Sequence, residues 1–162
     1  MAALCPFTVV AGLGAEDAVR YIVVELLSRY PGNAAEVVLS RQDAWHLFGI
    51  DVGTFREDQI PGLTLLEDAE EIRRYLLVST TSRRVLISSA ADGGGYCDIA
   101  AQHRDGLALV CLSSDLEPSL TISADGETTT LAVGRQVPDR LRLLPRQEAF
   151  LALTAMPTFS TL

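Results

Sequence analysis

The chain has 162 residues, 48% of them hydrophobic, so it is long enough and apolar enough to fold as one domain with its own core. Its 21 acidic residues outnumber 13 basic ones, and the net charge of −8 argues against a protein that binds the phosphate backbone of nucleic acids. All basic residues are arginine, and this lysine-free composition excludes chemistry that needs a lysine, such as a Schiff base or the lysine of a P-loop.

The first forty residues predict a strand, a helix and a second strand. Residues 7–11 and 36–39 are short apolar runs rich in β-branched side chains, which is typical of strands. Between them, apolar residues recur at helical spacing and predict one helix over 16–30. Pro31 and Gly32 end this helix.

Two further helices are expected before residue 78. Ser40 is a suitable N-cap for a helix that ends at Gly49, and Asp43 occupies the position of a capping-box partner. Residues 50–63 have no clear period and predict a long connection. Residues 65–77 predict the third helix, whose acids come first and whose arginines come last, as the helix dipole favours.

The second half predicts short strands joined by glycine turns. We expect strands at residues 84–88, 96–102, 107–113, 120–123 and 128–133. They are separated by a glycine run at 92–95 and by Asp-Gly at 105–106 and 125–126, a strong hairpin signal. Pro145 suits the first turn of a C-terminal helix, expected to include residues 148–156.

Together these elements predict an α+β fold within a single domain, residues 1–162. An antiparallel sheet of about five strands (residues 84–134) is expected to pack against helices mainly from residues 15–78 plus a C-terminal helix.

Gly12 and Gly14 lie between the first predicted strand and the first predicted helix. This turn resembles the phosphate-binding turn of a dinucleotide-binding βαβ unit, where glycines let backbone amides approach a pyrophosphate. It departs from that pattern at Asp17, which stands where the third glycine is expected, and Glu16 precedes it. Two carboxylates there would repel a phosphate and instead suit a helix N-terminus. Because of the resemblance, we keep nucleotide or small-ligand binding through Gly12–Asp17 as one alternative function. The competing interpretation is a glycine turn followed by acids that favour a helix N-terminus.

A second alternative is a cysteine-dependent enzyme centred on Cys97. A glycine run precedes Cys97 and His103 follows it, a combination that a cysteine hydrolase could use. On one strand, however, the six-residue separation would place the two about 20 Å apart, too far for a nucleophile and its base. A buried cysteine on a core strand is the competing interpretation.

No cofactor, metal or disulfide framework is expected. The three cysteines (Cys5, Cys97 and Cys111) form no CxxC, and the two histidines, His46 and His103, lie far apart in the sequence. The sequence shows no signal-peptide pattern and no run of 18 apolar residues, so we expect a cytoplasmic protein that does not enter a membrane.

The acids Glu67, Asp68, Glu70 and Glu71 at the start of the third predicted helix form the most acidic cluster. They predict either a solvated helix face or a docking surface for another, basic protein. For an acidic cluster alone, a solvated face is the more common case. The negative charge, the compact size and the absence of clustered catalytic residues nevertheless favour a non-enzymatic acidic binding protein of the inhibitor, immunity or chaperone kind, which uses this acidic face or a sheet edge. The positive mean hydropathy of +0.24 further predicts a covered apolar patch and hence a homodimer or obligate complex.

Overall fold

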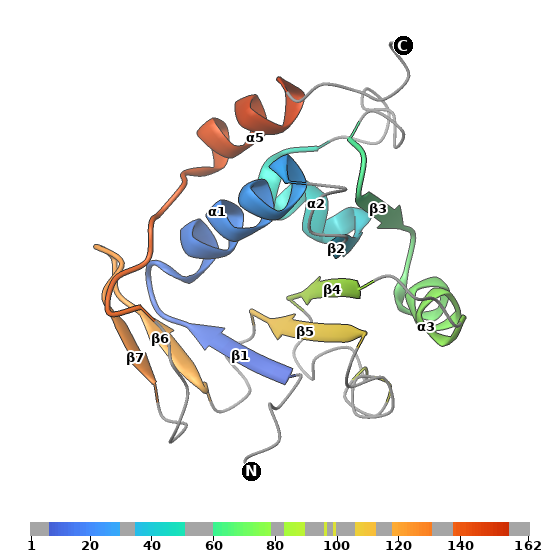
Figure 1. The fold of residues 1–162 in the computed structure, drawn as a ribbon, viewed down its shortest axis with the longest axis horizontal. Helices are drawn as coiled ribbons and strands as arrows, with labels where there is room; N and C mark the ends of the chain where they lie inside the picture. The colour runs from blue at the N-terminus through green and yellow to red at the C-terminus, as the bar shows by residue number, and fades with distance from the viewer. Residues whose placement is uncertain are drawn as a thin grey trace.

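The computed structural model describes residues 7–29, 35–50, 60–78, 83–89, 96, 99, 106–112, 118–130 and 138–155, within which strands and helices alternate along much of the chain (Figure 1). The strands are β1 (Phe7–Ala11), β2 (Ala35–Ser40), β3 (Leu63–Leu66), β4 (Arg83–Ser88), β5 (Leu107–Cys111), β6 (Leu120–Ile122) and β7 (Thr128–Thr130). The helices are α1 (Ala15–Ser28), α2 (Arg41–Phe48), α3 (Ala69–Leu77) and α5 (Arg146–Thr154).

The strands form one sheet in the order β3-β2-β4-β5-β1-β6-β7. Neighbours from β3 to β6 pair in parallel, and among the described strands only β7 runs antiparallel to its neighbour. The mixture of helices and strands is confirmed, but the antiparallel five-strand sheet over 84–134 is wrong. The Asp-Gly at 105–106 makes no hairpin, because the following β5 pairs in parallel with both β4 and β1.

Two other expectations about local structure need correction. Residues 65–77 do not form one helix: β3 extends to Leu66, and α3 begins only after Asp68, whose side chain caps it by accepting from the Glu71 amide at 2.9 Å. The expected strand at 96–102 is contradicted where it is described, since Tyr96 lies outside any strand and Ile99 is helical. Its remaining residues and the glycine run at 92–95 lie outside the described residues.

Several local expectations are confirmed. Ser40 caps α2 by accepting from the Asp43 amide at 3.0 Å, and Gly49 ends this helix in the left-handed conformation at φ +71°. The Asp-Gly at 125–126 does join an antiparallel hairpin, between β6 and β7. The C-terminal helix is present as α5, although Pro145 precedes it in the N-cap position and does not lie in its first turn.

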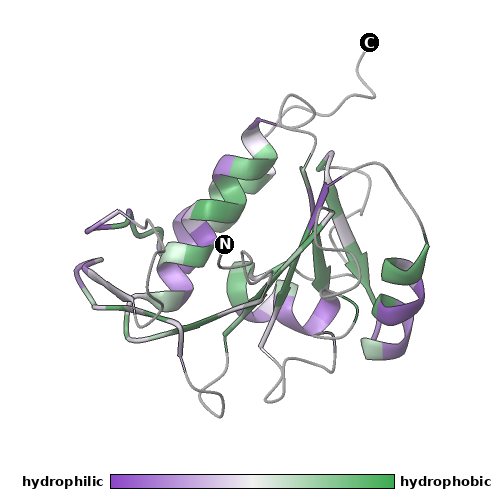
Figure 2. Ribbon diagram, turned by 60° about the horizontal axis from the view of Figure 1, so that its bottom comes forward, coloured by the Kyte–Doolittle hydropathy of each residue, from purple (hydrophilic) through white to green (hydrophobic). Residues whose placement is uncertain are grey.

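Helices cover the two faces of the sheet as separate layers (Figure 1). Apolar side chains of α1, α2 and α5 pack with Val37 and Leu39 of β2 on one face. On the other face, Ile72 and Leu76 of α3 pack with Val38 of β2. In Figure 2 the central strands are mostly hydrophobic, whereas the helices show both hydrophilic and hydrophobic residues. This is the pattern expected for a sheet that is buried on both sides.

The buried arginine Arg84 fastens α3 to the sheet. Its guanidinium donates to the carbonyls of Tyr75, Leu76 and Val78 at 3.0, 3.2 and 3.3 Å. A positive charge therefore caps the C-terminal carbonyls of α3, where the helix dipole favours it. The Tyr75 ring lies 5.6 Å from the same guanidinium, and its hydroxyl donates to Glu36 of β2. Burial, followed by the hydrogen bond to Glu36, raises the pKa of Tyr75. The tyrosine is therefore neutral at pH 7 and acts as a hydrogen-bond donor.

Candidate functional site

The parallel strands all end at the same edge of the sheet, and the connections that leave this edge divide between its two faces. After β2 the chain moves outward to β3 through α2, and after β4 it moves the other way to β5 past Tyr96 and Ile99. β2 and β4 are neighbours in the sheet. The connection that leaves β2 lies on one face of the sheet and the connection that leaves β4 lies on the other, so the two connections diverge at this point. In α/β sheets, ligands bind in the crevice at such a topological switch point, outside the carboxyl ends of the strands.

A cavity of about 330 Å³ opens at this position, which we call the switch-point cavity. Its volume lies at the lower end of the range of small-molecule sites. Its lining residues lie at or after the ends of β2, β3 and β4: Ser40, Gln42, Asp43, Glu67, Asp68, Ala69, Ile72, Ile87, Ser88, Ser89 and Tyr96. None of these described lining residues is cationic. The polar part of the wall consists of carboxylate, hydroxyl and amide groups, and Ala69, Ile72 and Ile87 supply apolar surface beside them.

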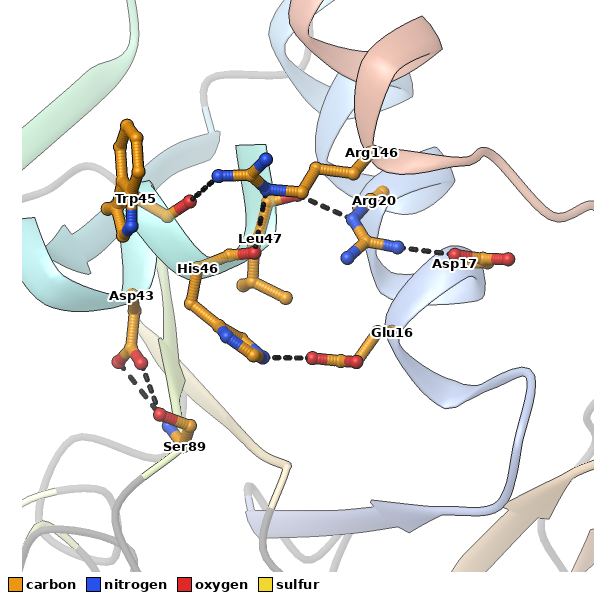
Figure 3. Close-up of polar contacts among 9 residues, drawn as sticks. All are labelled: Glu16, Asp17, Arg20, Asp43, Trp45, His46, Leu47, Ser89 and Arg146. Atoms are coloured by element: carbon orange, nitrogen blue, oxygen red, sulfur yellow. Dashed lines mark hydrogen bonds and ion pairs between the residues drawn. The ribbon is translucent and has the colours of Figure 1, made fainter. Parts of the chain in front are cut away.

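Asp43 ties the two diverging strands together at this crevice. It is only 6% exposed, and its carboxylate accepts from the Ser89 amide at 3.3 Å and from the Ser89 hydroxyl (Figure 3). In a complete capping box this carboxylate would turn back to the amide of Ser40. Here it reaches across to the end of β4 instead, so a buried carboxylate forms part of the cavity lining.

The four acids predicted to bind a partner have different positions. Glu67 and Asp68 line the cavity, and Glu67 also pairs with Nε of Arg41 at 2.8 Å. Asp68 caps α3, while the Glu71 carboxylate accepts from the Glu67 amide at 3.3 Å. Glu70 lies on the exposed surface and does not line the cavity.

A second cavity of about 240 Å³, the β1 cavity, adjoins the first because Ser89 lines both. Its other lining residues are Val10, Ala11, Gly12, Ala15, Glu16, His46 and Leu112. Most of them are small or apolar. Glu16 contacts Nε2 of His46 at this site, and this contact joins the start of α1 to α2 (Figure 3).

Two arginines hold α2, which contributes to both cavities. Arg146 of α5 donates to the carbonyls of Trp45 and His46 at 2.8 and 3.2 Å, and Arg20 of α1 donates to the carbonyl of Leu47 (Figure 3). These carbonyls lie in the last turn of the helix, where cations are favourable. The position of His46 and Asp43 is therefore set by contacts from α1 and α5.

The turn that resembles a dinucleotide-binding turn is used for packing within the chain. A Cβ atom on Gly12 or Gly14 would lie 2.1 Å from a carbonyl oxygen of Ile122 or Ser123, and the Gly14 amide donates to Ile122 at 3.0 Å. These glycines therefore let α1 begin against the end of β6. In the dinucleotide-binding unit the first two strands are neighbours, whereas here β4 and β5 lie between β1 and β2.

The predicted cysteine site cannot be placed, because Cys97 and His103 lie outside the described residues. Cys111 is a buried free thiol on β5. Among the described residues, no group of three or more acids, histidines or cysteines is arranged to hold a metal ion.

Sequence reasoning did not find the site at Asp43, Ser88, Ser89 and Tyr96. A signal was present, since Ser40 and the pair Ser88–Ser89 each come directly at the end of a predicted strand. If the strands had been predicted as parallel, these polar residues would have been expected at one edge of the sheet.

Fold and site together define an α/β protein with a cavity at its topological switch point. Comparison of the chain with protein-family models, with curated proteins and with solved structures found no match. In the part of the chain that the structure describes, no helix is long and apolar enough to cross a membrane. The cytoplasmic location stays a prediction.

Proposed function

We propose that the protein binds a small polar ligand in the switch-point cavity. The observation that carries this proposal is the position of the cavity, between the carboxyl ends of two parallel strands whose connections diverge. Asp43, Glu67 and Asp68 supply carboxylate oxygens there. A ligand rich in hydroxyl or amino groups would match these acceptors, because charge-assisted hydrogen bonds are the strong ones.

If this function is correct, small molecules rich in hydrogen-bond donors should raise the melting temperature of the protein. A substitution that fills the cavity with a larger side chain should abolish this increase. A compound at about 100 times its dissociation constant stabilises a protein by about 2.7 kcal/mol, or about 5–10 °C in melting temperature for a chain of this size. We expect such a shift from members of a panel of sugars, nucleosides and polyamines. In Ala69→Trp the shift should disappear, since Ala69 is exposed at the mouth of the cavity.

The matched control is Ala155→Trp, at an exposed residue that lines neither cavity. This variant should keep the full ligand shift. Equal shifts in Ala69→Trp and the wild-type protein, or no shift from any compound of the panel, would contradict the proposal.

A second function, docking of a basic partner protein on α3, rests on a different observation. Besides its acidic first turn, this helix leaves Leu77 and Val78 at its C-terminal end 55% and 64% exposed. An acidic and an apolar region on one helix form a surface that a partner can cover. Glu70 belongs to this surface but not to the cavity, so it separates the two proposals.

We expect Glu70→Arg to weaken binding of such a partner, most strongly at low salt, because exposed charges are screened as ionic strength rises. Native mass spectrometry of protein purified from its source cells measures the bound partner and, in the same spectrum, the predicted homodimer. Glu148→Arg, at an exposed acid on α5, is the control. Equal occupancy in both variants would exclude the α3 surface.

A further inference from the structure

The two cavities share Ser89 but differ in the charged side chains that line them. On one side of Ser89, the switch-point cavity presents the carboxylates of Asp43, Glu67 and Asp68. On the other side, the β1 cavity is formed mainly by Ala11, other small apolar residues and backbone. Because Ser89 lines both, a molecule that extends past Ser89 from one cavity to the other would meet carboxylates at one end and small apolar side chains at the other.

We propose that the ligand is an uncharged nucleoside, with its ribose in the switch-point cavity and its base in the β1 cavity. This inference rests on the proposed ligand-binding function. Neighbouring hydroxyl groups of ribose are donors for carboxylates, the pairing by which acidic residues recognise ribose in other α/β proteins. Asp43 keeps acceptor capacity for them, since each carboxylate oxygen can accept more than one hydrogen bond.

The β1 cavity suits a planar base. Ala11 and Gly12, at the end of β1, carry little or no side chain, and Val10 and Leu112 supply apolar contact. Glu16 and His46, which contact each other, also line this cavity, and their remaining polar atoms can meet the polar edge of a base. Hydrophobic walls with a few placed polar groups are typical of sites for flat ligands.

A phosphate is disfavoured at every helix N-terminus near the site. α1 begins with Glu16 and Asp17, whose negative charge repels an anion. At the N-termini of α2 and α3, the amides of Asp43 and Glu71 are already bonded by the side chains of Ser40 and Asp68, and the carboxylates of Asp43 and Asp68 add negative charge there. The site therefore selects the nucleoside over its phosphate ester.

Isothermal titration with D-ribose, adenosine, cytidine and adenosine 5′-monophosphate tests this inference. We expect at least one nucleoside to bind at least about tenfold more tightly than ribose, because the base adds buried apolar contact. The monophosphate should bind more weakly than adenosine. Ala11→Leu, which fills the β1 cavity, should reduce nucleoside affinity to that of ribose and leave ribose binding unchanged.

His46→Trp obstructs the same cavity from an exposed residue, so a folding defect in Ala11→Leu leaves the test intact. Nucleoside affinity that is unchanged in both variants, or a monophosphate that binds more tightly than adenosine, would overturn the inference. If no nucleoside binds while a sugar or polyamine binds and is lost in Ala69→Trp, this inference fails and the proposed function stands. If no compound binds at all, the proposed function fails as well.

Discussion

Replacing Arg84 by methionine is expected to lower the free energy of unfolding by about 3 kcal/mol, or about 6–12 °C in melting temperature. The guanidinium donates to three carbonyls at the end of α3, and Arg84 is only 5% exposed. Methionine fills much of the space but donates no hydrogen bond, so the carbonyls of Leu76 and Val78 lose this donor and that of Tyr75 keeps only the Val78 amide. Urea denaturation measures the change, with the denaturant slope expected to stay the same.

The neighbouring residue provides the control. Arg83 is exposed on the same strand, so Arg83→Met should change stability by no more than about 0.5 kcal/mol. Similar losses in both variants would show that the effect comes from removing charge rather than from losing the contacts to α3. Because Asp68 and Ala69 at the start of α3 line the switch-point cavity, Arg84→Met is also expected to weaken ligand binding there.

Gly14→Ala is expected to lower the free energy of unfolding by about 2–3 kcal/mol. This is the upper part of the range for adding atoms to a closely packed site. The added Cβ would lie 2.1 Å from the Ser123 carbonyl oxygen, which belongs to the backbone after β6. The start of α1 must then move away from β6, and this movement breaks the hydrogen bond from the Gly14 amide to Ile122. Thermal unfolding followed by circular dichroism measures the loss.

Gly106→Ala is the matched control, because a Cβ at Gly106 meets no atom within 4 Å. Its stability should equal or slightly exceed that of the wild-type protein, since alanine restricts the unfolded chain more than glycine does. If Gly14→Ala is tolerated as well as Gly106→Ala, the turn is not packed against β6. The interpretation of Gly12–Asp17 as a phosphate-binding turn would then regain support.

The features that the sequence determined are those set by neighbours along the chain. The helical spacing of apolar residues located α1, and Ser40 and Gly49 marked the two ends of α2. Asp125-Gly126 located the one hairpin among the described strands. Caps, turns and amphipathic faces depend on residues within a few positions of one another, so their signals are present in the sequence itself.

The direction of the strands, and with it the site, was decided only by the tertiary structure. The apolar run of β5 fits an antiparallel or a parallel neighbour equally well, and its pairing with β1 joins residues about 100 positions apart. Leu63–Leu66 is similarly ambiguous, since a short apolar run fits either a strand or the start of a helix. Placement beside β2 made it a strand.

Asp43 shows the same division within one residue. The sequence predicted that Asp43 lies in the first turn of α2, where its amide donates to Ser40. It did not predict that the Asp43 carboxylate accepts from Ser89, 46 positions away. That contact exists only because β2 and β4 are neighbours in a parallel sheet, which brings their carboxyl ends to one crevice. The sequence by itself therefore determined the elements, and the order of strands, fixed by long-range packing, determined where a ligand can bind.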